Sequence, residues 1–219
     1  MNARPAPDDD APLDPAAMLA LIQTQQSEME RRMAAATPWI VAAWGIAWVV
    51  GFGALFLIDG ARPGFAIPLP VAVGTFIALM IAAVIASAVL GARMGRGVKQ
   101  TKEANFNGAV FGVTGSASFF AMYVFAVGLT RNGMDPDLLN IFFPTSSALI
   151  VGIFYALAGG FWRIVPMIWM GAWIALVGLV APFFGYPHHY LFFALAGGGG
   201  FLVGGIVAAA LLRSGRWVV

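Results

Sequence analysis

The chain has 219 residues, of which 60% are apolar and only 10% are charged, and its formal net charge is +2. A typical soluble domain is about 45–50% apolar and about 25% charged, so this composition excludes an ordinary soluble enzyme and indicates a membrane protein. The chain has no cysteine, which excludes disulfides, thiolate metal sites and cysteine nucleophiles.

The N-terminal part of the chain differs from the rest. Residues 1–13 are rich in proline, include three consecutive aspartates and have little to bury, which predicts a disordered tail. Asp14 can cap a helix and Pro15 suits its first turn, and apolar residues then recur at helical spacing. We predict a cytoplasmic, juxtamembrane amphipathic helix over residues 14–37, which ends before Pro38 because a residue that precedes proline is disfavoured in the α conformation.

Six apolar segments follow, each close to the roughly 20 residues that an α-helix needs to cross the hydrocarbon core of a bilayer. Turn residues separate them, among them Asp59-Gly60, Asn132-Gly133 and Gly185-Tyr186-Pro187. The predicted fold class is therefore all-α, with a six-helix transmembrane domain over residues 38–212 and a cytoplasmic tail over 213–219. We place the spans at 38–58, 68–91, 108–129, 140–159, 164–182 and 189–212.

Lysine and arginine are distributed unevenly over the two sides that these spans define. Ten lie on the side of both termini, and only Arg62 and Arg131 lie on the other. Positive residues accumulate in cytoplasmic loops, so we predict a multi-pass protein of a bacterial cytoplasmic membrane with both termini in the cytoplasm. The densest basic cluster is a candidate site for anionic lipid headgroups, worth about 1 kcal/mol for each residue. It comprises Arg93, Arg96, Lys99 and Lys102.

Small residues recur at i,i+4 in several spans, a pattern typical of close helix packing in membranes. The longest stripes are Gly74, Ala78, Ala82 and Ala86 in the second span, and Ala148, Gly152, Ala156 and Gly160 in the fourth. The last span contains four consecutive glycines, each of which lowers helix propensity by roughly 1 kcal/mol relative to alanine. This run predicts either a hinge, as in the broken helices of transporters, or a very close helix crossing. The run is Gly197, Gly198, Gly199 and Gly200, and Gly204 lies one turn further along as part of the same candidate hinge or close contact.

Polar residues within the spans are few and uncharged. No Lys, Arg, Asp or Glu lies in the apolar part of any span, which argues against a charge-coupled pump and leaves no carboxylate pair for acid–base chemistry. Asn107, Thr114 and Ser118 fall within about 40° of one another on the third span, and with Tyr155 they are candidates for a substrate path. The alternative is interhelical hydrogen bonding, worth about 0.6 kcal/mol on average.

Two further features of the spans carry polar groups. Pro144 can free a backbone carbonyl in the fourth span, just before Thr145, Ser146 and Ser147. His188 and His189 are neighbours at the outer end of the last span, and side chains at i,i+1 point apart, which is unsuitable for a shared metal ion. We interpret the histidines as interfacial residues beside tyrosines, with a pH sensor as the alternative. We predict no catalytic residue, metal, cofactor or nucleic-acid partner.

The first span and its approach support a resemblance. A Gln-rich helix leads into Pro38-Trp39, and Trp44-Gly45, Trp48 and Gly51-Phe52-Gly53 follow. This segment resembles small six-span actinobacterial membrane proteins, often labelled as transporters. The resemblance covers about residues 17–212 and transfers no functional residue.

Two functions follow from these features. The leading prediction is a small transporter, or a transporter-associated subunit, for an uncharged or amphipathic solute. The alternative is a non-catalytic membrane scaffold that recruits a partner through its N-terminal helix. Either function places the chain in the lipid bilayer, with a second copy or another membrane protein as its partner there.

Overall fold

The computed structural model describes residues 14–95 and 101–214, and within these ranges the regular structure is helical, with no strand. Six helices are long and apolar enough to cross a membrane, which confirms the predicted all-α fold with six spans. The predicted tail at 1–13, most of the tail at 213–219, and Arg96 and Lys99 of the basic cluster lie outside the described residues.

The six spans lie close to the predicted segments, and the predicted N-terminal amphipathic helix stays a prediction. That segment is α1 (Pro15–Ala35), and the first four spans are α2 (Thr37–Phe56), α3 (Leu69–Met94), α4 (Lys102–Arg131) and α5 (Pro136–Phe161). The fifth span is α6 (Val165–Val180) with a 3₁₀ turn, η1 (Ala181–Phe184). The last span has three parts, α7 (His188–Phe192), a π-helical turn η2 (Phe193–Gly198) and α8 (Gly199–Arg213). The boundary of α4 differs from the expected start at residue 108, because Thr101 Oγ1 accepts a hydrogen bond from the Ala104 N–H at 3.1 Å and caps the helix earlier.

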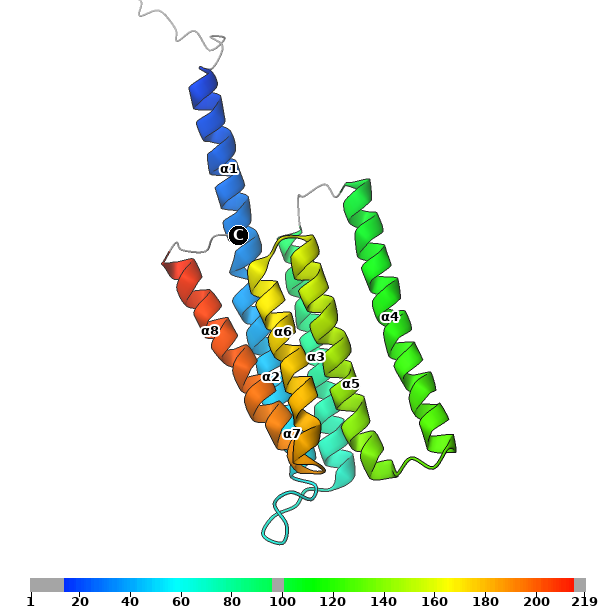
Figure 1. Ribbon diagram of the computed structural model, residues 1–219. Coiled ribbons are helices and arrows are strands. Elements are labelled where there is room, and N and C mark those ends of the chain that lie inside the picture. The colour runs from blue at the N-terminus through cyan, green and yellow to red at the C-terminus, as the bar shows by residue number, and fades with distance from the viewer. Residues whose placement is uncertain (1–13, 96–100, 215–219) are drawn as a thin grey trace, which may run out of the picture.

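The spans form a bundle in which α2 is central, and α8 and α4 lie at opposite edges (Figure 1). Helix α2 packs against α3 and against all three parts of the last span, whereas α5 and α6 form the most extensive helix pair. Helix α6 also contacts η2 and thereby joins this helix pair to the last span. Helix α4 lies at the edge of the bundle beside α5, and α1 projects away from it.

An aromatic cluster fills the contact between α2 and the last span. The Trp48 ring lies 5.2 to 5.8 Å, centroid to centroid, from Phe52, Phe193 and Phe201, in edge-to-face arrangements. Phe52 and Phe193 stack at 4.9 Å, and Phe193 is completely buried. Aromatic pairs of this kind add about 0.5–1.5 kcal/mol each to the burial of their surfaces, so this cluster is the energetic centre of the bundle.

Helices α5 and α6 approach each other through glycine. A Cβ added at Gly152 would lie 2.6 Å from the Ala175 backbone nitrogen, and one at Gly178 would lie 3.1 Å from the Ala148 Cβ. The turn between the helices is short: Arg163 adopts a positive φ of 57°, and the Ile164 N–H donates to the Gly159 carbonyl at 2.7 Å. This is the hydrogen-bond pattern of a Schellman C-cap, which reverses the chain in a few residues.

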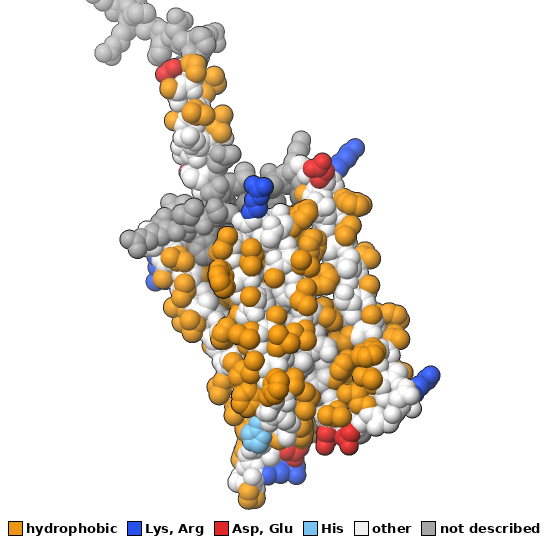
Figure 2. Space-filling view, viewed as in Figure 1, with side chains coloured by type: hydrophobic (Ala, Val, Ile, Leu, Met, Phe, Trp, Pro, Cys, Tyr) orange, Lys and Arg blue, Asp and Glu red, His pale blue; other side chains and the backbone are white. Residues whose placement is uncertain are grey.

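The outside of the bundle matches a protein surrounded by lipid. Figure 2 shows apolar side chains over the length of the spans and charged side chains near the two ends. Helices α3 and α4 have the smallest buried share of the six spans. The bilayer, a second copy or another membrane protein therefore has to cover most of their surface.

A pair of substitutions in α5 tests the glycine contact. We expect Gly152→Ala to destabilise the protein by about 1–3 kcal/mol, because the new methyl group meets the α6 backbone. Gly160 lies in the same helix with no atom within 4 Å of an added Cβ, so Gly160→Ala should be neutral or should stabilise by up to about 1 kcal/mol. Thermal unfolding in detergent measures both variants. Equal effects at the two positions would contradict this packing.

Candidate functional site

The predicted path residues lie on two neighbouring helices, with Asn107, Thr114 and Ser118 on α4 and Tyr155 on α5. Ser118 and Asn107 are half-buried on α4, and Ser118 Oγ donates to the Thr114 carbonyl at 2.9 Å. Thr114 itself is exposed, and Tyr155 is half-buried on α5. The three α4 residues lie on one face of that helix. In the described part of the chain, the only hydrogen bond within this predicted set is the local one from Ser118 to Thr114.

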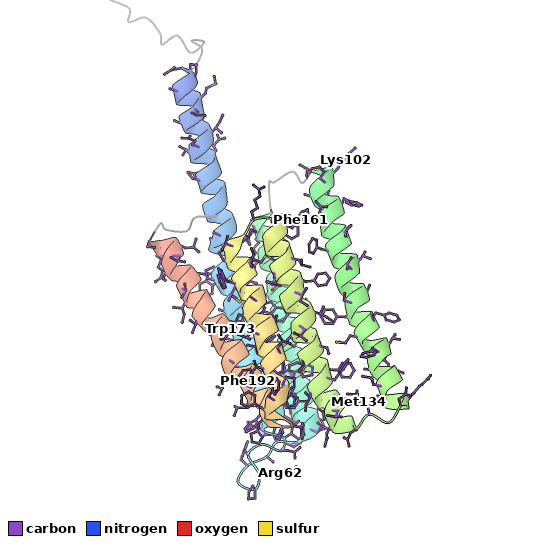
Figure 3. The ribbon with its side chains drawn as sticks, viewed as in Figure 1. Arg62, Lys102, Met134, Phe161, Trp173 and Phe192 are labelled. Carbon is purple, nitrogen blue, oxygen red and sulfur yellow. The ribbon has the colours of Figure 1, made fainter. Side chains whose placement is uncertain are left out.

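The contact between α4 and α5 is largely aromatic. The Phe111 ring of α4 lies 6.2 Å from Phe154 and 5.1 Å from Trp162, and the side chains of the two helices meet in the space between them (Figure 3). The polar contact is Ser147 Oγ to Met122 Sδ at 3.7 Å. Helix α4 is described along its whole length, and Ala126 is its one buried residue. The two helices therefore meet mainly through large aromatic rings and not through close backbone contact.

An open groove lies between α4 and α5 near the Met134 turn. Its volume is about 280 Å³, and its walls are mainly apolar. Thr130 and Arg131 are the polar residues among those that line it. The groove is lined by Tyr123, Ala126, Val127, Thr130, Arg131, Leu139 and Phe143. Its shape and chemistry suit a small apolar or amphipathic molecule.

The glycine run of the last span lies where that span meets two other helices. A Cβ on Gly197 would lie 2.5 Å from Trp48 Cε3, and one on Gly198 would lie 2.7 Å from the Val49 backbone nitrogen. On the other side, Gly200 faces the indole of Trp173, whose Nε1 donates to the Ala196 carbonyl at 3.2 Å. These three glycines make the contacts of close packing.

The remaining glycines of this group are less constrained. Gly199 has no atom within 4 Å of an added Cβ, and Gly204 faces the end of the Met170 side chain at 3.1 Å. At Phe193–Gly198 the backbone hydrogen bonds of the span change from the α-helical to the π-helical pattern, and the helix continues beyond this turn. It is therefore continuous in direction but irregular in its backbone, as π-helical turns in α-helices commonly are.

A polar cluster joins two turns at the end of the bundle that holds Asp59. The Tyr186 hydroxyl donates to Asp59 Oδ2 at 2.6 Å, and Arg62 Nε lies 3.3 Å from Asp59 Oδ1. Burial, and then the hydrogen bond to Asp59, raise the pKa of Tyr186 above its ordinary value. Next to this cluster His189 is completely buried, whereas His188 is exposed. His189 contacts α5 as well as its own turn, and the position of both histidines at the membrane interface stays a prediction.

The predicted lipid-binding cluster is described only in part. Arg93 lies in the last turn of α3 and Lys102 begins α4, and both side chains are exposed. They lie at the end of the bundle that also holds Arg163 and Arg213. Headgroup binding at these residues stays a prediction.

Sequence reasoning did not find the contacts of Asp59, Tyr186 and Trp173. The signal for the first pair was present as two polar residues in turns on the same predicted side of the membrane. Trp173 carried no such signal, because its acceptor is a backbone carbonyl of another helix.

No family model matches the chain, and no curated protein and no solved structure matches it either. The resemblance to six-span actinobacterial membrane proteins therefore stays a prediction. Among the described residues there is no group of three His, Asp or Glu side chains placed to hold a metal ion.

The Tyr186–Asp59 hydrogen bond predicts a dependence of stability on pH. Tyr186→Phe should destabilise the protein by about 1 kcal/mol near pH 8, where the hydroxyl is protonated. The folded-state pKa of Tyr186 is raised, so its contribution is fully present below the unfolded pKa of about 10 and is lost as the pH rises further. The difference in melting temperature between the wild type and this variant should therefore shrink above pH 10.

Tyr123 supplies the matched control for this measurement. It is exposed on α4, so Tyr123→Phe should leave both the melting temperature and its pH profile unchanged. A Tyr186→Phe variant whose difference from the wild type is constant from pH 8 to pH 11 would refute the assignment.

Proposed function

We propose that this protein is a small transporter, or a transporter-associated membrane subunit, for an uncharged or amphipathic solute. The observation that supports the proposal is the contact between α4 and α5. It combines a polar face on α4, aromatic side chains of both helices that contact one another, and an open groove of about 280 Å³. The fold supplies the membrane spans, and this contact supplies the one place where we expect a solute.

The packing of α4 supports a solute-binding role for this contact. Every other span buries several residues or meets α2 or α6 closely, whereas α4 buries only Ala126 along its fully described length. A helix held by so few buried contacts separates from its neighbour at a low free-energy cost. Movement of α4 against α5 is therefore the motion we expect during transport.

The chemistry of the contact supports the solute class. No charged residue lies between residues 108 and 129 of α4, so nothing there would compensate the charge of an ionic solute in the hydrocarbon region. The groove walls at Val127, Leu139 and Phe143 suit an apolar group, and Thr130 and Arg131 can bind a polar group. Ser118 and Asn107 would extend the polar contacts along α4.

Two pairs of substitutions in α4 test this proposal in reconstituted vesicles. Val127 lines the groove and Val124 is exposed on the same helix, so Val127→Phe should abolish most uptake while Val124→Phe should not. Ser118 and Ser116 both donate to the carbonyl four residues earlier at 2.9 Å, but only Ser118 lies on the predicted path. Ser118→Ala should reduce uptake about 2–10-fold, the equivalent of about one hydrogen bond, and Ser116→Ala should have no effect.

The experiment uses a panel of neutral and amphipathic solutes, with uptake and ligand-dependent thermal shift as its readouts. Equal effects of Val127→Phe and Val124→Phe would contradict the groove as the binding site. If no solute of the panel gives either uptake or a thermal shift, that result would count against the transporter proposal itself.

A scaffold is the second candidate function, and α1 favours it. Leu19, Leu21 and Ile22 are each more than half exposed on this helix, and Met18 nearly so. The helix projects from the bundle (Figure 1), so these side chains are available to a partner protein. Deletion of residues 1–36 separates the two functions, because a scaffold loses its co-purifying partner whereas a self-contained carrier keeps its uptake.

A further inference from the structure

Pro144 interrupts the hydrogen bonding of α5 inside the helix. In an α-helix the N–H of each residue donates to the carbonyl four residues earlier, so the Asn140 carbonyl would receive its hydrogen bond from residue 144. Proline has no N–H, and its ring also pushes that carbonyl aside. The Asn140 carbonyl therefore needs another donor, and water is scarce in a membrane-spanning helix.

The donor comes from the last span. His189 Nε2 lies 3.0 Å from the Asn140 carbonyl oxygen, and the histidine is completely buried. Its other ring nitrogen, Nδ1, lies 3.2 Å from the Gly185 carbonyl oxygen. That carbonyl already accepts the His189 backbone N–H at 2.8 Å, so it does not depend on the ring.

The hydrogen-bond partners of the two carbonyls indicate which ring nitrogen of the neutral imidazole carries the proton. Only one ring nitrogen carries a proton in the neutral form. A proton on Nε2 satisfies the carbonyl that Pro144 deprives of its donor, whereas a proton on Nδ1 would satisfy a carbonyl that is already paired. The Nε2–H tautomer therefore leaves fewer buried polar groups unsatisfied.

We infer that His189 replaces the backbone donor that Pro144 lacks, and that the imidazole in its Nε2–H form is a latch between α5 and the last span. The latch joins residues 49 positions apart in the chain. The segment that it holds, Pro136 to Pro144, also carries Leu139 and Phe143 of the groove wall. The latch thus fixes one side of the groove, whatever molecule binds there, and the inference does not rest on the proposed function.

A double-mutant cycle on the full chain in detergent tests the latch. His189→Leu should lower the melting temperature by several degrees, because the Asn140 carbonyl is left without a donor. In the Pro144→Ala background the alanine N–H takes over, so the same His189→Leu substitution should lose more than half of its effect. His189→Gln, whose side-chain amide can donate, should retain most of the wild-type melting temperature.

His188 provides the matched control. It is exposed beside His189, so His188→Leu should have a small effect that is the same with proline or alanine at position 144. An effect of His189→Leu that is equal in the two backgrounds would overturn the latch.

Nitrogen-15 NMR of the histidine ring in the wild-type protein gives a second readout, which needs no variant to fold. The latch requires that the neutral imidazole ring of His189 carries its proton on Nε2 and has an unprotonated Nδ1. A proton on Nδ1 alone would overturn the inference even if His189→Leu failed to fold.

Discussion

A backbone carbonyl that loses its helical partner within a bilayer has no water to replace it, and this constraint shapes the contacts of the last span. Pro144 creates such a carbonyl at Asn140, and His189 lies within hydrogen-bond distance of it. The π-helical turn of the last span distorts a second stretch of backbone, and there Trp173 donates to Ala196. At Asn140 a side chain from another helix supplies the missing donor, and at Ala196 a side chain adds a hydrogen bond to a carbonyl that also accepts the Gly199 N–H.

These two hydrogen bonds both involve the last span, which is the most buried of the six. One ties it to α5 near the Asp59 end, and the other ties it to α6 at the π-helical turn. On its opposite side the span meets α2, where the Trp48 ring lies against Gly197. A larger residue at Gly200 would meet the Trp173 indole. The Trp173–Ala196 hydrogen bond therefore depends on this glycine.

The sequence alone predicts the elements of this fold better than their contacts. Long apolar runs and turn residues are local signals, and they identify all six spans. The sequence also shows that Pro144 leaves a backbone carbonyl without its donor. It does not show that His189 donates to that carbonyl, because His189 and Asn140 meet only after the helices pack. The π-helical turn is hidden for the same reason: Trp48 and Trp173, which surround it, belong to other helices. The candidate path on α4 and Tyr155 of α5 stays a prediction, and the groove depends on a contact between α4 and α5 that no local pattern reveals.

Helix α5 shows why one pattern of residues leads to two kinds of contact. On its α6 side Gly152 allows the backbones to meet, and no solute fits between them. On its α4 side aromatic rings meet instead, Phe154 with Phe111 and Phe142 with Phe125, and the groove lies at Phe143, next to the second pair. A small-residue stripe permits a close approach without requiring one, as Gly74 on α3 shows, since no atom lies within 4 Å of an added Cβ there. The side chain on the facing helix therefore decides whether a pair of spans becomes rigid core or leaves room for a ligand.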